Sequence, residues 1–226
     1  MKIKSFIKRL NATELGLGVT NDTYIAIPSE VNLSHMLENQ VVLRPYDRTT
    51  GEVYNPQRSA FKYVQTGQNN QERISGLGEY YEQTAARVGD EILVEKIEDS
   101  SGSKYYLDLH HRNAIVFQVN KISGRACVEI LPTNLIQQFA DGENFICQVV
   151  YDGKPQELKV EFFIAAKKKK TSPNVTRFYD LLINGSSILK SYTYQEYIEL
   201  VTDGMRLGRM KTYWYSEVSI MEDNNG

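Results

Sequence analysis

Cysteine and histidine are scarce in this chain of 226 residues, and their scarcity excludes several kinds of site. The two cysteines, Cys127 and Cys147, are too few for a disulfide framework or a zinc site built from cysteines. Three histidines leave little material for a histidine-based metal centre. Both cysteines lie among apolar residues, so we expect buried free thiols in a reducing compartment.

Long apolar runs are missing as well. No stretch approaches the length that a membrane-spanning helix requires, so we expect no membrane partner. The first nine residues are charged throughout and lack the apolar core and cleavage site of a signal peptide. These two observations predict a cytoplasmic protein.

Familiar catalytic motifs are also absent. The sequence has no Walker lysine signature, no GxGxxG after a predicted strand and no Gly-x-Ser-x-Gly elbow. The best enzymatic candidate is Asp152 with Glu157 and Lys159, residue types that hold Mg²⁺ and assist catalysis in phosphodiesterases. The aspartate lies close to the Glu-x-Lys pair, whereas restriction-type nucleases place the two on different strands of a hairpin. The sequence therefore favours a binding module over an enzyme.

The net charge of −2 is distributed unevenly along the chain. Residues 1–75 hold nine basic and seven acidic side chains, residues 76–165 hold eight and fourteen, and residues 166–226 hold nine and seven. A protein that binds a specific DNA sequence needs a local basic face rather than a basic average. The charge distribution is therefore compatible with DNA binding.

Alternating and β-branched stretches predict that strands dominate the chain. The clearest is Lys104–His111, in which Tyr105, Leu107 and Leu109 would share one face. Further strands are expected at Lys2–Leu10, Thr23–Ile27, Gln40–Tyr46, Arg58–Gln65, Asp90–Ile97, Asn113–Lys121, Ala126–Leu131, Asn144–Val150, Glu157–Ala165 and Arg209–Val218. The predicted fold class is mainly β with short helices.

Three short helices are predicted, at Ser29–Glu38, Thr133–Phe139 and Thr193–Gly204. The third begins with Thr193-Tyr194-Gln195-Glu196, which has the form of a capping box. A lysine-rich segment, Lys167–Pro173, is typical of an exposed linker. We therefore expect one domain over residues 1–166, followed over residues 167–226 by a linker and an extension containing a helix and a strand.

Two polar loops carry most of the functional signal. The first is Lys8–Thr23 and the second is Gln65–Gly78, which is dense in amides. Asn and Gln can bind adenine through two hydrogen bonds, Arg prefers guanine, and Asp or Glu can accept from cytosine. Each loop by itself is also typical of a surface hairpin.

Together, the two loops and their flanks resemble the N-terminal effector domain of the EcoRII-type restriction endonucleases. The resemblance is carried by Ile7-Lys8-Arg9-Leu10, Tyr24-Ile25-Ala26-Ile27-Pro28, Tyr54-Asn55 with Arg58, Glu72-Arg73-Ile74, Ile130-Leu131-Pro132 with Phe139 and Gly142, and the stretch 179–204. It implies an open β pseudobarrel that grips double-stranded DNA between two arms in the major groove. The second arm has fewer positive charges than in the family and carries amides instead, so the recognised site is expected to differ in detail.

The resemblance also implies roles for individual residues. Base contacts are expected from Arg9, Asn11, Thr13, Glu14, Asn21, Asp22 and Thr23 of the first arm, and from Gln68, Asn69, Asn70, Glu72 and Arg73 of the second. Phosphate contacts are expected from Lys4, Lys8, Arg48 and Lys62.

The functional hypothesis is sequence-specific recognition of a CCWGG-like site as the effector module of a type II restriction system. This chain needs no cofactor in that role, and Mg²⁺ would be required only by an attached nuclease domain or subunit. Two alternatives stay open: a complete Mg²⁺-dependent nuclease using Asp152, Glu157 and Lys159, and a β-rich interaction scaffold that binds no nucleic acid.

Overall fold

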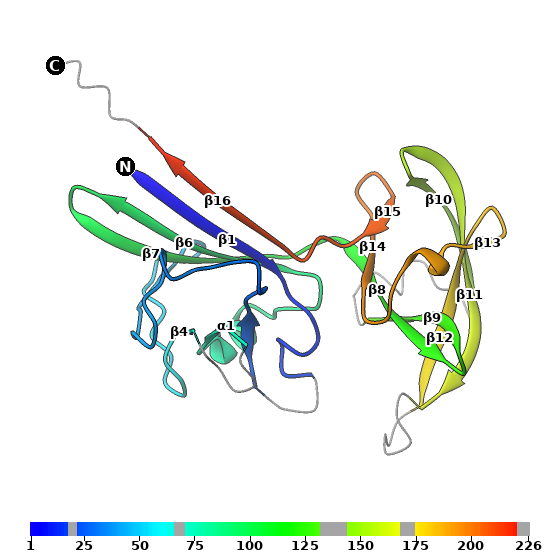
Figure 1. The fold of residues 1–226 in the computed structure, drawn as a ribbon, viewed down its shortest axis with the longest axis horizontal. Coiled ribbons are helices and arrows are strands. Elements are labelled where there is room, and N and C mark those ends of the chain that lie inside the picture. Colours follow the sequence, from blue (N-terminus) through cyan, green and yellow to red (C-terminus); the bar gives the residue numbers. More distant parts are fainter. Residues whose placement is uncertain (18–21, 66–70, 132–143, 168–174, 221–226) are drawn as a thin grey trace. The chain divides into compact units, whose positions relative to one another are not determined.

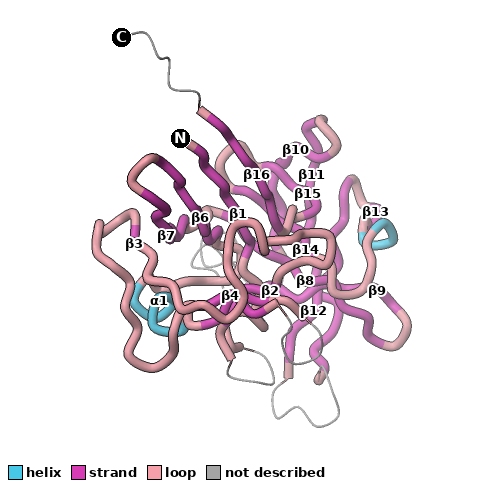
Figure 2. Tube along the Cα trace, turned by 60° about the vertical axis from the view of Figure 1, so that its left-hand side comes forward, coloured by secondary structure: helices cyan, strands magenta, loops and turns pink. Residues whose placement is uncertain are grey.

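The computed structural model describes residues 1–17, 22–65, 71–131, 144–167 and 175–220. Strands account for 54% of the structure and helices for 5%, which confirms the prediction of a mainly β protein (Figure 2). Within these ranges no helix has the length and apolar character needed to cross a membrane.

The chain folds into two compact units, and the first is built from two separate parts of the sequence (Figure 1). Unit 1 comprises Met1–His111 and Thr212–Gly226, and unit 2 comprises Arg112–Lys211. The predicted division between residues 166 and 167 is therefore wrong. These residues lie inside unit 2, and the strands on either side of the lysine-rich segment, Lys154–Ala166 and Thr176–Ile183, pair with each other.

A five-stranded sheet forms the larger layer of unit 1, in the order β16-β1-β6-β7-β3. Its strands are β1 (Lys2–Arg9), β3 (Tyr46–Asp47), β6 (Glu91–Asp99), β7 (Gly102–His110) and β16 (Tyr213–Ser219). Side chains of β1, β6 and β7 alternate, so that Phe6, Val94 and Leu107 all enter the apolar core. β16 comes from the second part of the sequence and pairs antiparallel with β1 (Figure 1).

A smaller sheet in unit 1 has the order β2-β5-β4. Its strands are β2 (Tyr24–Ala26), β4 (Lys62–Val64) and β5 (Arg73–Ser75), and a short helix α1 (Gly78–Gln83) follows β5. Ile25, Tyr63 and Ile74 occupy the central position of each strand and are fully buried in the core. One face of this small sheet therefore packs inward, and the flanking positions of each strand lie on the opposite face.

Unit 2 is one sheet that closes on itself. Its order is β11-β10-β15-β14-β8-β9-β12-β13, and an additional pairing joins β11 to β12. The strands are β8 (Ala114–Ile122), β9 (Arg125–Ile130), β10 (Phe145–Tyr151), β11 (Lys154–Ala166), β12 (Thr176–Ile183), β13 (Ser186–Ser187), β14 (Tyr197–Val201) and β15 (Arg206–Arg209). A second apolar core, which includes Phe117, Leu158 and Leu200, fills its interior.

Glycine-containing turns close three hairpins of unit 2. The pairs Ser123-Gly124, Asp152-Gly153 and Asn184-Gly185 connect β8 to β9, β10 to β11 and β12 to β13. All six residues have positive φ, as the two-residue type I′ turn requires at both positions. This backbone twist matches the twist of the flanking strands, so the turns set the register of each hairpin.

Two of the predicted helices are wrong. Residues 29–38 form turns, and the stretch from Thr193 contains strand β14. The capping-box hydrogen bond does form, because the Thr193 amide donates to Glu196 Oε2 at 2.9 Å, but Gln195 has a φ of 71° and ends any helical path. Ile198 and Leu200 are then buried with the period of a strand. The predicted helix Thr133–Phe139 lies outside the described residues.

Candidate nucleic-acid interface

The small sheet of unit 1 joins the two polar loops predicted from the sequence. The first loop leads into β2, and the second connects β4 to β5. Tyr24 pairs with Ser75, and Ala26 pairs with Arg73, so the first loop enters at one end of the sheet and the second leaves at the other. A three-residue strand spans about 7 Å, which is less than the width of about 12 Å of a DNA major groove.

The opposite face of this sheet is partly exposed and carries two cations, Lys62 and Arg73, together with the apolar residues Ala26 and Val64. Tyr24, Lys62 and Ser75 are aligned across the three strands, and Arg73 lies two residues before Ser75 on the same face. The Ser75 hydroxyl donates to the Lys62 carbonyl at 3.4 Å, which holds β4 against β5. The structure therefore places one predicted base-contacting residue, Arg73, on the same face of the sheet as one predicted phosphate-contacting residue, Lys62.

A cavity of about 230 Å³ opens beside Arg73. It is lined by Asp22, Thr23, Tyr24, Ser59, Arg73, Ser75 and Gly76. The Arg73 guanidinium lies over the ring of Tyr24, with its carbon 5.7 Å from the ring centroid. Its Nε–H is buried and has no acceptor among the described residues.

Two features fix the walls of this cavity. Gly76 has a φ of 86°, and a Cβ built there would lie 2.1 Å from the Ala60 carbonyl oxygen. Glycine is therefore required for the backbone next to Ser59 to approach β5. Burial and the nearby negative charge of Glu14 raise the pKa of Tyr24, so its hydroxyl stays protonated near neutral pH.

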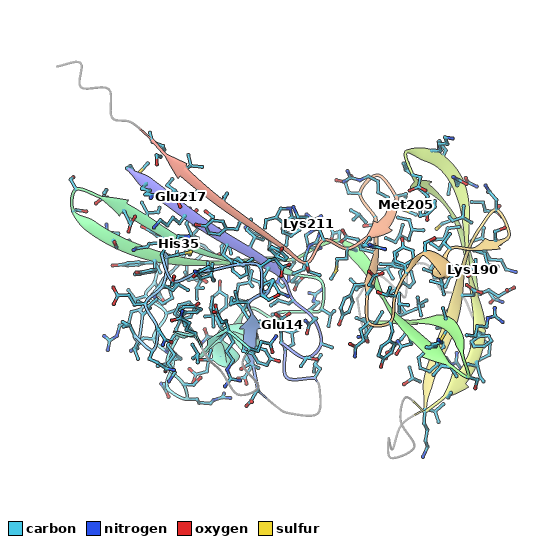
Figure 3. All side chains as sticks on the ribbon, viewed as in Figure 1. Glu14, His35, Lys190, Met205, Lys211 and Glu217 are labelled. Atoms are coloured by element: carbon cyan, nitrogen blue, oxygen red, sulfur yellow. The ribbon has the colours of Figure 1, made fainter. Side chains whose placement is uncertain are left out.

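Inside the first loop, Glu14 is the central structural residue (Figure 3). It is 1% exposed, and its carboxylate accepts hydrogen bonds from the amides of Asn11 and Ala26. Lys8 Nζ lies 3.0 Å from Glu14 Oε1 and is itself buried. The predicted base contact by Glu14 and phosphate contact by Lys8 do not fit this geometry, because the two groups form an internal ion pair that connects β1, the loop and β2.

Two further predicted contacts also lie in the interior. Arg9 is 3% exposed, donates to the Gly89 carbonyl, forms an ion pair with Glu91 and lies over the ring of Trp214. Lys4 is 6% exposed and donates to the His35 carbonyl at 2.6 Å. Neither side chain faces solvent, so the predicted base contact by Arg9 and phosphate contact by Lys4 are corrected to structural roles.

Other predicted residues of the first loop divide between structure and surface. Asn11 Oδ1 accepts from the amides of Thr13 and Glu14 and so caps the turn. Thr13 and Asp22 are exposed, and Thr23 is half-buried at the rim of the cavity. These three side chains therefore stay within reach of a ligand.

In and near the second loop, Glu72 accepts a hydrogen bond from the Tyr63 hydroxyl at 2.5 Å, and its carbonyl accepts from the Ile27 amide. It therefore stabilises the small sheet. Arg48 is paired with Glu95 and lies over the ring of Tyr106. The remaining predicted base-contacting residues lie outside the described residues: Asn21, Gln68, Asn69 and Asn70.

The alternative nuclease set lies in unit 2. Asp152 occupies the β10–β11 turn, whereas Glu157 and Lys159 lie along β11, where Lys159 Nζ is 2.5 Å from Glu161 Oε1. In the ranges that the structure describes, no three His, Cys, Asp or Glu side chains are grouped as metal ligands would be.

Tyr24, Ser59 and Ser75 were missed as site residues by sequence reasoning. These three residues lie near Arg73 because of strand pairing and the close backbone contact at Gly76. No local sequence motif identifies them as neighbours of Arg73. The alternation of polar and apolar residues around Ile74 is one sequence signal for this arrangement. Because Ile74 is buried, Arg73 and Ser75 both lie on the opposite face of the strand.

Comparison with family models, with curated proteins and with solved structures finds no match to the chain.

Proposed function

We propose that unit 1 binds double-stranded DNA in a sequence-specific manner, as the effector-recognition module of a type II restriction system. The observation that carries the proposal is the outer face of the small sheet, where two polar loops flank Arg73, Lys62 and a hydroxyl-lined cavity. The resemblance to the EcoRII-type effector domain supports the same reading and adds the pseudobarrel architecture for unit 1. A CCWGG-like duplex is the first ligand to test.

In this proposal Arg73 contacts a base edge and Lys62 contacts the DNA backbone. A guanidinium held over an aromatic ring is oriented as a planar fork, which suits the two acceptors of guanine. A lysine is a point charge on a flexible stem and suits a phosphate. Tyr24, Thr23, Ser59 and Ser75 supply hydroxyls that complete the polar surface around the contacted base.

The test is a fluorescence anisotropy titration of the full chain with a CCWGG duplex and a shuffled duplex. Arg73→Ala should cost about 1–3 kcal/mol on the preferred duplex and little on the shuffled one. Arg73→Lys should fail to restore the preference, because a lysine keeps the charge and loses the fork. Lys62→Ala should weaken binding to both duplexes alike. It should also reduce the slope of log affinity against log salt concentration by about one.

Arg87 provides a matched control, because it is an exposed arginine of the same unit that does not line the cavity. Arg87→Ala should leave both affinities unchanged. Equal affinity of the wild-type protein for a panel of unrelated duplexes would contradict sequence-specific binding, and equal losses from Arg73→Ala and Arg87→Ala would contradict the role of Arg73.

A further inference from the structure

Strand β16 forms an open edge of the larger sheet in unit 1. It is seven residues long and pairs with β1 on one side, and no described residue pairs with its other side. Figure 1 shows it as the outermost strand, beyond β1. All its residues from Tyr215 to Ser219 are exposed. An edge strand of this length offers a row of backbone donors and acceptors to another strand.

The usual protections of an edge are missing from β16. Its sequence, Tyr-Trp-Tyr-Ser-Glu-Val-Ser, contains no proline, lysine or glycine, and its register with β1 has no bulge. The described edge strands β3 and β13 have two residues each, and β2 and β4 have three. Aromatic and β-branched residues of β16, including Tyr215 and Val218, are instead exposed.

Backbone hydrogen bonds show which groups of β16 are unused by β1. Met1 and Ile220 exchange both hydrogen bonds, and the Arg9 amide donates to the Thr212 carbonyl. In an antiparallel pair such bonded positions recur every second residue. The even-numbered residues of β16 therefore bond to β1, and the amides and carbonyls of Tyr213, Tyr215, Glu217 and Ser219 point away from the sheet.

We propose that β16 pairs antiparallel with β16 of a second copy of this chain, around a twofold axis at Ser216. This register uses every outward backbone group: Tyr215 bonds with Glu217 of the second copy, and Tyr213 with Ser219 of the second copy, for about eight hydrogen bonds. Trp214 then lies opposite Val218 of the second copy, which is a favourable aromatic and β-branched pair.

Charge is compatible with this twofold pairing. Glu217 is the single charged residue of β16, and it already forms an ion pair with Lys2 of its own chain (Figure 3 labels Glu217). Across the axis it meets Tyr215 of the second copy, and within one chain the Tyr215 hydroxyl already donates to Glu217. No like charges face each other, so a second copy is a suitable occupant of this edge.

The first test measures the mass of the full chain in solution by light scattering over a dilution series. The wild-type protein should form a dimer that dissociates on dilution. Ser216→Lys and Ser216→Glu should each be monomeric, because two like charges meet at the axis. An equimolar mixture of the two variants should restore a dimer containing one copy of each. A monomeric wild-type protein at all concentrations would overturn the proposal.

A cysteine at the axis tests the register directly. Two residues that face each other in a non-hydrogen-bonded antiparallel pair have Cα atoms about 4.5 Å apart, which a disulfide can bridge. Under mild oxidation Ser216→Cys should give a covalent dimer on a denaturing gel. Ser219→Cys, equally exposed, faces Tyr213 of the second copy and should not. Cross-linking of the Ser219→Cys variant but not of the Ser216→Cys variant would show a different interface. A dimer that persists in the Ser216→Lys variant would show the same, and either result would overturn the proposed β16 pairing.

Discussion

The two units differ in what they bury. In unit 1, the described interior includes seven charged side chains: Lys4, Lys8, Arg9, Glu14, Asp47, Asp90 and Glu95. The described interior of unit 2 includes one, Asp180, which pairs with Arg125 and accepts from the Ser187 hydroxyl at 2.6 Å. Unit 2 is therefore stabilised by apolar packing, whereas unit 1 also depends on specific polar contacts.

The described strands and connections of the two units also differ. Unit 2 consists largely of long strands, several of them joined by two-residue turns that need little support. Unit 1 contains long irregular segments between short strands, and their backbone groups need partners. Buried carboxylates such as Glu14 and Asp47 supply these partners. The polar interior of unit 1 is thus the means by which its loops are held in place.

The largest effect is expected from Glu14→Ala. It removes one partner of a buried ion pair and leaves Lys8 charged and unpaired, which costs about 3–5 kcal/mol of unfolding free energy. Trp214 is the only tryptophan and lies in unit 1, so urea unfolding followed by its fluorescence reports on that unit. Glu38→Ala, at an exposed carboxylate of unit 1, serves as the control. Similar midpoints for the two variants would contradict the structural role of Glu14.

A comparable loss in unit 2 should come from an apolar truncation. Leu158 is fully buried in the core of unit 2, so Leu158→Ala should cost about 2–5 kcal/mol. Circular dichroism should detect the loss, while the Trp214 transition should move less than it does for Glu14→Ala. Equal shifts of the Trp214 transition in both variants would mean that the two units unfold as one.

A smaller and pH-dependent effect is expected from Asp47→Asn. Burial raises the pKa of Asp47, but hydrogen bonds, led by the Thr50 amide at 2.7 Å, outweigh it and hold the pKa below its ordinary value. A carboxyl group whose pKa is lowered by folding stabilises the folded state at pH values above its unfolded-state pKa. This stabilisation is lost as the pH falls through the folded-state pKa. The variant should thus cost about 1–3 kcal/mol at pH 6 and progressively less in acid. A cost independent of pH would contradict this assignment.

The smallest effect is expected at a surface ion pair. Arg58 bonds both carboxylate oxygens of Glu82, but its side chain is 70% exposed. Because solvent and salt screen such pairs, Arg58→Ala should cost far less unfolding free energy than any of the buried substitutions above. Thermal unfolding at low and high salt tests this, and a loss as large as that of Glu14→Ala would remove the distinction between buried and exposed charges.

Much of the strand content could be predicted from the sequence. The strands around Glu91–Asp99, Gly102–His110 and Ala114–Ile122 lie close to their predicted positions, because alternation and β-branched residues mark them locally. The predicted helix after Thr193 failed because a capping-box pattern is satisfied equally well by a turn before a strand. The insertion of unit 2 into unit 1 could not be predicted, because it depends on the pairing of β16 with β1.

The candidate site was predicted less well. Lys8 and Arg9 were assigned to DNA because basic residues beside a polar loop resemble a nucleic-acid contact. Their partners Glu14 and Glu91 are visible in the sequence, but nothing local indicates that these pairs are buried. Arg73, predicted to contact a DNA base, lines a polar cavity whose residues come from three separate segments of the chain, and this grouping could not be predicted from the sequence.

The insertion of unit 2 also sets an order in time. On the ribosome, β1 is made first and β16 only after the 100 residues of unit 2, from Arg112 to Lys211. At about 5–20 residues per second, unit 2 alone takes about 5–20 s to make, and β1 lacks its outer partner for longer, because the rest of unit 1 up to His111 is also made in between. The last residue of unit 2, Lys211, is made before any residue of β16. The division of the chain into two units therefore also sets the order of synthesis: unit 1 is begun first, and it is completed only after unit 2 has been made.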